Sequence, residues 1–465
     1  MNTMQLKRLT LSVMMMGASA AVMASGYHFG TQSVSSQSTA NASAAEAADA
    51  STIFYNAAGM TKLEGTNFSG ALNLVMPSVE YSNASGNYPT GGAITLGDGG
   101  SGTTAATSGK ITEDLIAVPH FYLSHQLNDK VYLGLGVYVP YASDTEYQRN
   151  SVLRYNLNAT SLTTIDINPT VAFKLNEQHS VAVGMIAQYA KAHLRQYANF
   201  GFAIGGAGAN GLADGFADVD GDDWGFGYNL AWMWDISDKT RVGLNYRSEI
   251  EHTLSGTAKW NKSKAIATFG AGAGTALANA GYKDSEGASV DITTPESLSL
   301  HGMHKLNDKV DLFADLTWTK HSRFSTAQLK YANAKTGQGN ITYLNPDWKD
   351  TYKIAIGGSY QWSNPLQLRF GIAYDKSPVP DDNHRLATMP DNDRYWYSFG
   401  AKYDINKSNS VDVAYSYIQI KDAKANVTGK CSAYGVSQCV SSQTTATADY
   451  KSHAQILGVQ YNYKF

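Results

Sequence analysis

The chain of 465 residues contains 36 Lys plus Arg and 39 Asp plus Glu, and its formal net charge is −3. This balance argues against a nucleic-acid partner, which would require a basic surface. Charged residues make up only 16%, whereas 29 Tyr, 15 Phe, 8 Trp and 43 Gly are typical of β-barrels with aromatic girdles at the membrane interfaces.

Residues 1–24 are predicted to be a signal peptide. Lys7 and Arg8 precede an apolar run that is too short to span a bilayer, and small residues precede Ser25. Removal of this peptide leaves a net charge of about −5, because two basic and no acidic residues are lost. Later stretches do not approach 18 consecutive apolar residues. We therefore expect an exported, all-β protein.

Residues 25–63 are rich in Ala and Ser and do not alternate as strands do. Residues 38–51 could form a short helix capped by Ser38 or Thr39. Two interpretations stay open, a flexible periplasmic tail and a plug inside the lumen of a large barrel.

Short polar turns and long loops alternate along the rest of the chain. The turns are at 126–131, 174–180, 235–241, 305–310, 361–367 and 404–410. The loops are at 81–112, 141–159, 198–222, 258–290, 332–347, 379–391 and 423–448. Runs of alternating residues flank each turn, which indicates hairpins. Six turns and seven loops predict a 14-stranded antiparallel transmembrane β-barrel over residues 64–465, in the Gram-negative cell outer membrane with its turns in the periplasm.

The strands show two distinct faces. In residues 224–236, Trp, Phe, Tyr and Leu alternate with Gly, Asn, Ala and Asp. The closing residues 457–465 end in Tyr463 and Phe465 on one face, and this strand should pair with the first strand so that no edge remains in lipid. A soluble β-sandwich is the alternative, but the aromatic residues on the apolar face and the charges on the other face favour the barrel.

The sequence predicts no cofactor, metal site or catalytic group. Its only cysteines, Cys431 and Cys439, are expected to form a local disulfide in an oxidising compartment, since further metal ligands of suitable spacing are absent. The acidic run at 218–223 lacks the downstream Glu of a calcium loop, and no nucleophile motif is present.

Three stretches carry a family resemblance, residues 26–60, 293–303 and 389–417. They resemble the N-terminal hatch, the Pro-Glu-Ser strand start and the most characteristic C-terminal stretch of the FadL and outer membrane protein P1 family, which contains long-chain fatty acid and hydrocarbon channels. The hatch turn corresponds to Asn56, Ala57, Ala58 and Gly59. Ala57 replaces the usual proline of the family and removes a fixed φ angle from this turn.

The resemblance implies passive uptake of a long-chain fatty acid or another lipophile. The expected steps are capture on apolar loops, transfer to a pocket, movement of the hatch (residues 25–63) and lateral exit at a kinked third strand. The predicted gate residues are Gly134, Gly136 and Pro140. The predicted capture residues are Phe200, Phe202, Ile204, Leu212 and Phe216, for which a self-packed lid is the alternative. The candidate carboxylate ligands are Arg241, Arg247, Lys353, Arg369, Arg394 and Lys402.

The expected partners follow from the same resemblance. They are outer-membrane lipid, lipopolysaccharide and the barrel assembly machinery, which would recognise the last strand through Phe465, and the barrel is expected to be a monomer. Two other function classes remain open. A general porin for hydrophilic solutes would need no plug, and a surface adhesin would act through its loops.

Overall fold

The computed structural model describes residues 26–88, 92–97, 103–204, 211–336, 339–428 and 445–465. The predicted signal peptide and the predicted disulfide between Cys431 and Cys439 lie outside the described residues.

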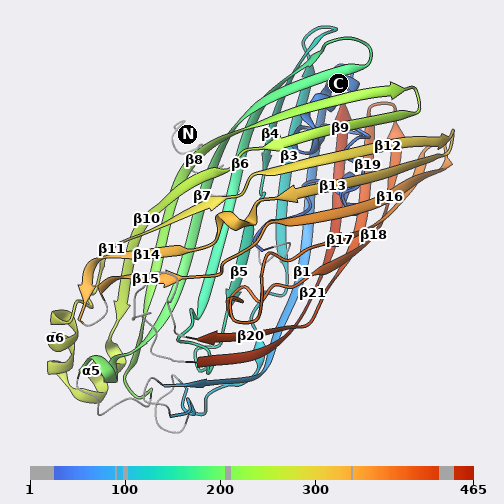
Figure 1. Ribbon diagram of the computed structural model, residues 1–465. Helices are drawn as coiled ribbons and strands as arrows, with labels where there is room; N and C mark the ends of the chain where they lie inside the picture. Colours follow the sequence, from blue (N-terminus) through green and yellow to red (C-terminus); the bar gives the residue numbers. More distant parts are fainter. Residues whose placement is uncertain (1–25, 89–91, 98–102, 205–210, 337–338, 429–444) are drawn as a thin grey trace.

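All strands belong to one closed antiparallel sheet (Figure 1). Its strands are β1 Thr66–Asn87, β2 Gly109–Lys110, β3 Ile116–Gln126, β4 Val131–Tyr138, β5 Ala142–Glu146, β6 Ala159–Lys174, β7 His179–Asn199, β8 Asp214–Ser237, β9 Thr240–Arg247, β10 Ile250–Asn261 and β11 Glu286–Thr294. The later strands are β12 Ser297–Asn307, β13 Val310–Thr319, β14 Ala327–Lys335, β15 Gly339–Leu344, β16 Thr351–Ser363, β17 Leu366–Asp375, β18 Arg394–Asn406, β19 Asn409–Ile420, β20 Ala423–Thr428 and β21 Thr445–Lys464. The helices are α2 Val34–Gln37, α3 Thr52–Tyr55, η1 Ala57–Lys62, α4 Phe200–Ala203, α5 Ser263–Phe269, α6 Ala271–Asn279 and η2 His321–Arg323.

These segments combine into fourteen barrel strands, because seven of the strands are interrupted. β9 and β10 both pair with β8, for example, and are two parts of one strand. β1 closes the barrel by pairing with β21, from Asn67 opposite Lys464 to Asn87 opposite Thr445. The predicted 14-stranded barrel and the predicted pairing of the last strand with the first are confirmed.

All six predicted turns join neighbouring strands at the end of the barrel where the chain finishes. Four of them contain an asparagine whose side-chain oxygen accepts hydrogen bonds from backbone N–H groups two and three residues later: Asn128, Asn176, Asn307 and Asn406. The asparagine thereby satisfies the backbone of a tight turn, which explains why the sequence repeats this residue there.

The opposite end departs from the prediction, since strands continue into the expected loops. β7 pairs with β8 as far as Asn199 opposite Asp214, so the 198–222 loop is much shorter than predicted. The predicted 258–290 loop instead contains α5 and α6, which project from this end (Figure 1). Facing strands can hydrogen-bond beyond the membrane as well as within it, and residue composition does not mark that boundary.

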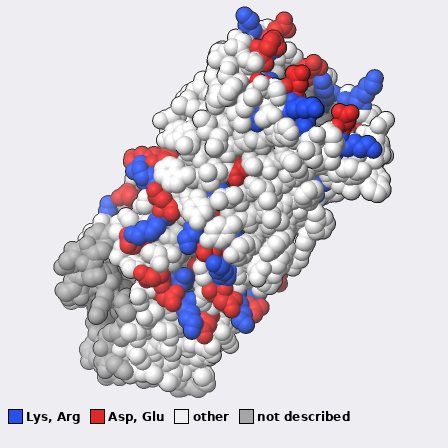
Figure 2. All heavy atoms as spheres, turned by 45° about the vertical axis from the view of Figure 1, so that its right-hand side comes forward, with Lys and Arg blue, Asp and Glu red and all other residues white. Residues whose placement is uncertain are grey.

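The outer surface carries a band without charged residues between two charged zones (Figure 2), and many large apolar side chains are exposed on it. Exposed side chains of this band include Leu135, Phe226, Leu230, Ile356 and Phe399. Aromatic residues border the band, with Trp232 and Trp234 beside His179 at one edge and Trp224 beside Tyr189 at the other. This arrangement is that of a barrel embedded in lipid. Among the described residues, no helix is long and apolar enough to span a membrane.

The N-terminal segment, residues 26–63, is packed against the inner wall of the barrel and is drawn in blue in Figure 1. The predicted helix starting at Ser38 or Thr39 is wrong. Ser33 caps the short helix α2 instead, and Ala40 and Asn41 have positive φ angles of 54° and 67°, which a right-handed helix does not allow.

Candidate functional site

The inner wall has a seat for the N-terminal segment that is built from glycines. Gly357, Gly371, Gly400 and Gly458 lie on β16, β17, β18 and β21, and each would place an added Cβ within about 3 Å of the segment. At Gly371 the added Cβ would lie 2.1 Å from the backbone carbonyl atoms of Thr39. Only glycine permits this close backbone approach.

Ion pairs hold the segment at this seat. Arg369 is 3% exposed and donates to both carboxylate oxygens of Glu46 at 2.9 and 2.8 Å, and it also donates to the Ser35 carbonyl. Arg241 donates to the Ala45 and Glu46 carbonyls and to Asp235, which also pairs with Lys62. Two of the six carboxylate-ligand candidates, Arg241 and Arg369, therefore bind the protein's own chain.

The predicted hatch turn is present without its proline. The Asn56 side-chain oxygen accepts from Ala58 N–H, and its Nδ2 donates to the Trp232 and Leu244 carbonyls. Ala57, Ala58 and Gly59 begin the helix η1. An asparagine cap and two barrel carbonyls fix this turn, so it does not depend on a locked φ angle.

The third barrel strand is broken between β4 and β5. Pairing between β3 and β4 ends at Phe121 opposite Val137, and in the described chain β5 pairs along its length only with β6. Residues 27–32, which we name the strap, lie along the edge left by this break. Phe29 N–H donates to the Pro140 carbonyl at 2.8 Å, and Ala142 N–H donates to the Tyr27 carbonyl at 2.8 Å.

The side chain of Gln32 completes this closure. Its Nε2 donates to the Val139 carbonyl at 2.9 Å and to the Phe29 carbonyl at 2.8 Å. Its backbone carbonyl accepts from the Tyr122 hydroxyl at 2.8 Å. The strap thus satisfies backbone groups that the interrupted sheet leaves without a strand partner.

The structure gives the predicted gate residues different positions. Pro140 lies in the break, but Gly134 and Gly136 lie in the paired part of β4. An added Cβ on Gly134 would overlap Met60, and one on Gly136 would overlap the Tyr138 ring. The two glycines therefore make room for inner side chains and do not break the ladder.

The strap contributes to the lining of two cavities. One has a volume of about 70 Å³ and is almost entirely apolar. Its lining includes Tyr27, Leu157, Leu162, Leu254, Phe324 and Met389. Such a lining suits a hydrocarbon chain.

The second cavity has a volume of about 90 Å³ and a polar lining. It includes His28, Arg247, Lys353, His321, Asp315 and Asp375. Burial and the neighbouring cationic groups, among them Lys353 and Arg247, lower the pKa of His28 to about 3. The strap imidazole is therefore neutral beside Lys353 and Arg247.

The strand breaks gather around this polar cavity. β4, β9, β11, β13 and β15 end at residues 138, 247, 294, 319 and 344, and their continuations begin at 142, 250, 297, 327 and 351. The cavity lining includes Tyr141, Arg247, Ser297, Thr319 and Thr351, each at or beside one of these breaks. At these breaks, polar side chains that face the lumen line the same cavity.

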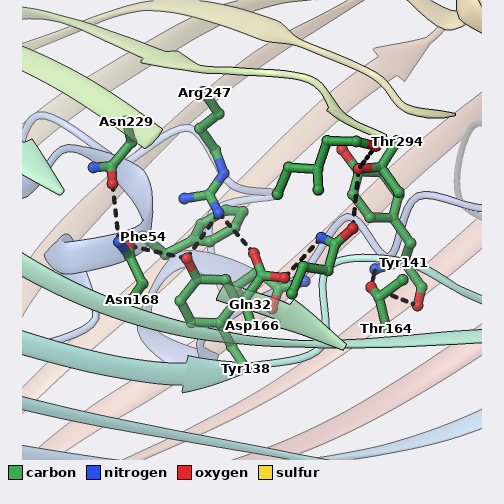
Figure 3. Close-up of polar contacts among 12 residues, drawn as sticks. Gln32, Phe54, Tyr138, Tyr141, Thr164, Asp166, Asn168, Asn229, Arg247 and Thr294 are labelled. Atoms are coloured by element: carbon green, nitrogen blue, oxygen red, sulfur yellow. Dashed lines mark hydrogen bonds and ion pairs between the residues drawn. The ribbon is translucent and has the colours of Figure 1, made fainter. Parts of the chain in front are cut away.

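A hydrogen-bond network extends from this cavity across the barrel wall (Figure 3). Arg247 Nη2 donates to the Tyr138 hydroxyl at 2.7 Å and to Asp166 at 3.0 Å. Tyr138 donates to Asn168 at 3.0 Å, and Gln188 donates to Asp166 at 2.7 Å. Arg247 Nη1 is buried without a hydrogen-bond partner in the described chain.

The remaining four carboxylate-ligand candidates fall into two groups, those that pair with acidic residues and those that line the polar cavity. Arg394 pairs with Asp391, and Lys402 lies 3.2 Å from Asp404. The Lys353 ammonium lies 4.4 Å from the centroid of the Trp396 ring. Of the six candidates, Arg247 and Lys353 are the two that line the polar cavity.

The predicted capture residues are mostly packed within the protein. Phe200 is fully buried against Trp260 and Tyr282, and the Phe216 ring lies beneath Arg149 and Arg195. Ile204 and Leu212 are half-buried, and the Phe202 side chain lies outside the described part of the chain. The self-packed lid is the better description of Phe200 and Phe216.

The exposed apolar residues at this end lie on α5, namely Ile266 and Phe269 at 38% and 42% exposure. The sequence could have indicated these two apolar residues, because both fall inside the predicted 258–290 loop. Within the described ranges, no group of three His, Cys, Asp or Glu side chains could hold a metal ion.

A closed 14-stranded barrel with an apolar outer band and a packed lumen defines a β-barrel protein of the outer membrane. The comparisons with known proteins specify the family. Residues 15–465 match the family described as outer membrane protein transport protein (OMPP1/FadL/TodX), and the chain belongs to this family. It is located in the Gram-negative outer membrane.

Several relatives match over most of the chain, and two of them illustrate the range of identity. The chain is 48% identical to a putative outer membrane protein of Neisseria meningitidis serogroup B, over 96% of each chain. It is 28% identical to the long-chain fatty acid transport protein of Escherichia coli, over 81% of this chain and 84% of the relative.

Solved structures agree in fold. A Pseudomonas aeruginosa FadL homologue has a TM-score of 0.84 at 24% identity, over 95% of this chain and 100% of its own. The Pseudomonas putida toluene transporter TodX has a TM-score of 0.62 at 15% identity, over 90% of this chain and 94% of its own. The Escherichia coli relative and TodX are named as transport proteins, in agreement with the description of the matched family.

Proposed function

We propose that the protein carries long-chain fatty acids passively across the outer membrane. The observation that carries this proposal is the position of two neighbouring strap residues. Tyr27 lines the apolar cavity and His28 lines the polar cavity that contains Arg247 and Lys353. A molecule with an apolar tail and an anionic head fits both, and the name of the Escherichia coli relative points to the same substrate.

The N-terminal segment acts as a hatch in this proposal. Its glycine seat and the Arg369–Glu46 pair support a segment that stays fixed in the lumen and blocks hydrophilic solutes. The strap contacts the barrel through hydrogen bonds to residues 139–142 and through aromatic packing of Tyr27 on Trp348 and of Phe29 on His120. In this proposal these contacts break while the rest of the hatch stays seated.

Lateral exit follows from the energetics of the tail. Burial of each methylene stabilises the ligand by about 0.8 kcal/mol, so a path through water would lose most of the tail's binding free energy. The break between β4 and β5 interrupts the barrel wall behind the strap, where Phe29 stacks on His120 with ring centroids 5.8 Å apart. Displacement of the strap would open this wall toward the lipid.

The test is uptake of radiolabelled oleate by a Gram-negative host that lacks its own fatty acid channel, measured beside influx of arabinose. We expect oleate uptake without arabinose influx. Arabinose influx alone would indicate a porin and overturn the proposal. Toluene uptake without oleate uptake would reassign the substrate to hydrocarbons, and failure to carry any of the three solutes would direct attention to the loops as an adhesin.

A matched pair of variants tests the head-group site. Lys353→Met removes a cation from the polar cavity, and loss of a charge-assisted hydrogen bond should lower oleate uptake roughly tenfold. Lys402→Met removes a lumen cation that pairs with Asp404 away from the cavity, and it should leave uptake unchanged. Equal uptake by both variants would exclude Lys353 as a head-group ligand.

A further inference from the structure

We infer that Arg247 couples occupation of the polar cavity to release of the strap, through Tyr138 and Tyr122. This inference rests on the proposed function in one respect, because it requires an anionic amphiphile as the ligand. It adds a named route by which the ligand would open its own exit.

Arg247 is the first residue of the route, and only one of its two terminal nitrogens makes hydrogen bonds in the described structure. Nη2 donates to the Tyr138 hydroxyl and to Asp166, while Nη1 is buried and has no hydrogen-bond acceptor in the described structure. A buried donor without an acceptor is costly, so an anion that enters the cavity gains strongly by binding there.

Tyr138 connects this arginine to the broken strand. It is the last residue of β4, directly before the break at Val139. Its ring stacks on the Tyr122 ring with centroids 5.8 Å apart and an angle of 23° between the rings. Gly136 is required for this stack, since an added Cβ would lie 2.9 Å from the Tyr138 ring and 3.2 Å from the Tyr122 ring.

Tyr122 connects the stack to the strap. Its hydroxyl donates to the Gln32 carbonyl, and the Gln32 side chain donates to the Val139 carbonyl. The contacts therefore run from the cavity through the side chains of Arg247, Tyr138 and Tyr122 to the Gln32 backbone, and the Gln32 side chain returns to the break.

The guanidinium also touches the hatch itself. Arg247 lies 4.6 Å from the centroid of the Phe54 ring, and Phe54 packs edge-on against Tyr138 at 5.1 Å (Figure 3). When a carboxylate binds Nη1, the guanidinium is drawn toward the ligand and its bond to Tyr138 weakens. The Tyr138 ring then loses one of the two hydrogen bonds that orient it, and the stack beneath Gln32 loosens.

Hydrogen exchange measured by mass spectrometry tests this route on the purified full-length protein. The amides of Phe29 and Ala142 make the strap hydrogen bonds, so peptides that contain them report strap opening. In the wild-type protein we expect oleate to accelerate their exchange about tenfold. Oleate binding is titrated in the same samples.

Three variants separate coupling from folding. Tyr138→Phe keeps the ring stack and removes the hydroxyl, and Arg247→Lys keeps the charge and removes the fork. Tyr138→Phe should still bind oleate, with less than a threefold change in strap exchange. Arg247→Lys alters the ligand-binding group and should bind oleate more weakly, and at saturating oleate its strap exchange should also change less than threefold. Tyr132→Phe is the control, because the Tyr132 hydroxyl on the same strand contacts Gln126 at the periplasmic end, and it should respond as the wild type does.

The possible outcomes distinguish failure of the Arg247 coupling from failure of the proposed transport function. A normal response in Tyr138→Phe, or in Arg247→Lys if the first variant does not fold, would overturn the coupling while the transport function stands. Oleate binding without faster strap exchange in the wild type would also overturn it. Absence of oleate binding would overturn the proposed function and the coupling together.

Discussion

Replacement of Gly371 by alanine should displace the N-terminal segment from its seat. The added Cβ would lie 2.1 Å from the carbonyl carbon and oxygen of Thr39, well inside the ordinary contact distance of 3.4 Å. These atoms belong to the backbone, so no side-chain rotation relieves the overlap. Overpacking of this kind costs about 1–3 kcal/mol, which corresponds to roughly a 5- to 150-fold shift toward the unseated segment.

The assay measures hydrogen exchange of peptides within residues 33–43 and arabinose flux through proteoliposomes. Gly371→Ala should accelerate the exchange by a factor in the predicted range and increase the flux. Gly302→Ala is the control, since the atoms nearest to its added Cβ lie at 3.6 and 3.8 Å. If Gly371→Ala matches the wild type in both measurements, the seat does not depend on the absence of a side chain and the reasoning is refuted.

Three further predictions concern single contacts. Glu46→Gln leaves Arg369 buried without its counter-ion, which costs about 3–5 kcal/mol, so exchange in the N-terminal segment should rise, and a second change of Arg369 to Gln should partly reverse it. Gln32→Ala leaves a buried carbonyl unsatisfied at about 1–3 kcal/mol, and faster exchange confined to the strap would be the expected result. Asp214→Asn weakens a pair with Arg154 in which both side chains are fully buried, so external protease should cleave the nearby loops on intact cells, whereas continued resistance would contradict the prediction.

The sequence predicted the barrel because its strongest signals are local. Alternation of apolar and polar residues reports which face meets lipid, and the asparagine turns report where strands reverse. Both patterns are set by neighbours within a few residues, so strand number and pairing order followed from counting.

The sequence could not reveal which polar residues were already paired. By parity all six basic candidates face the lumen, but the partners of Arg241, Arg369 and Arg394 depend on register and on the path of the N-terminal segment. The roles of Gly134 and Gly136 also depend on contacts that the sequence does not show. A glycine in a strand indicates a bulge or a close approach, and only the position of Met60 or Tyr138 decides between them.

The contrast between two lumen arginines bears on the choice of substrate. Arg369 uses its Nε and both terminal nitrogens on Gln367, Ser35 and Glu46, so each of its nitrogens already donates to the protein and it serves the fold. Arg247 is also buried, but its Nη1 faces no acceptor among the described residues, and it lines a cavity. A hydrocarbon such as toluene offers this nitrogen only the weak acceptor of its ring face, which compensates the burial less than a charged oxygen does. A carboxylate compensates it when the ligand arrives, which favours an anionic amphiphile as the molecule for which this cavity is built.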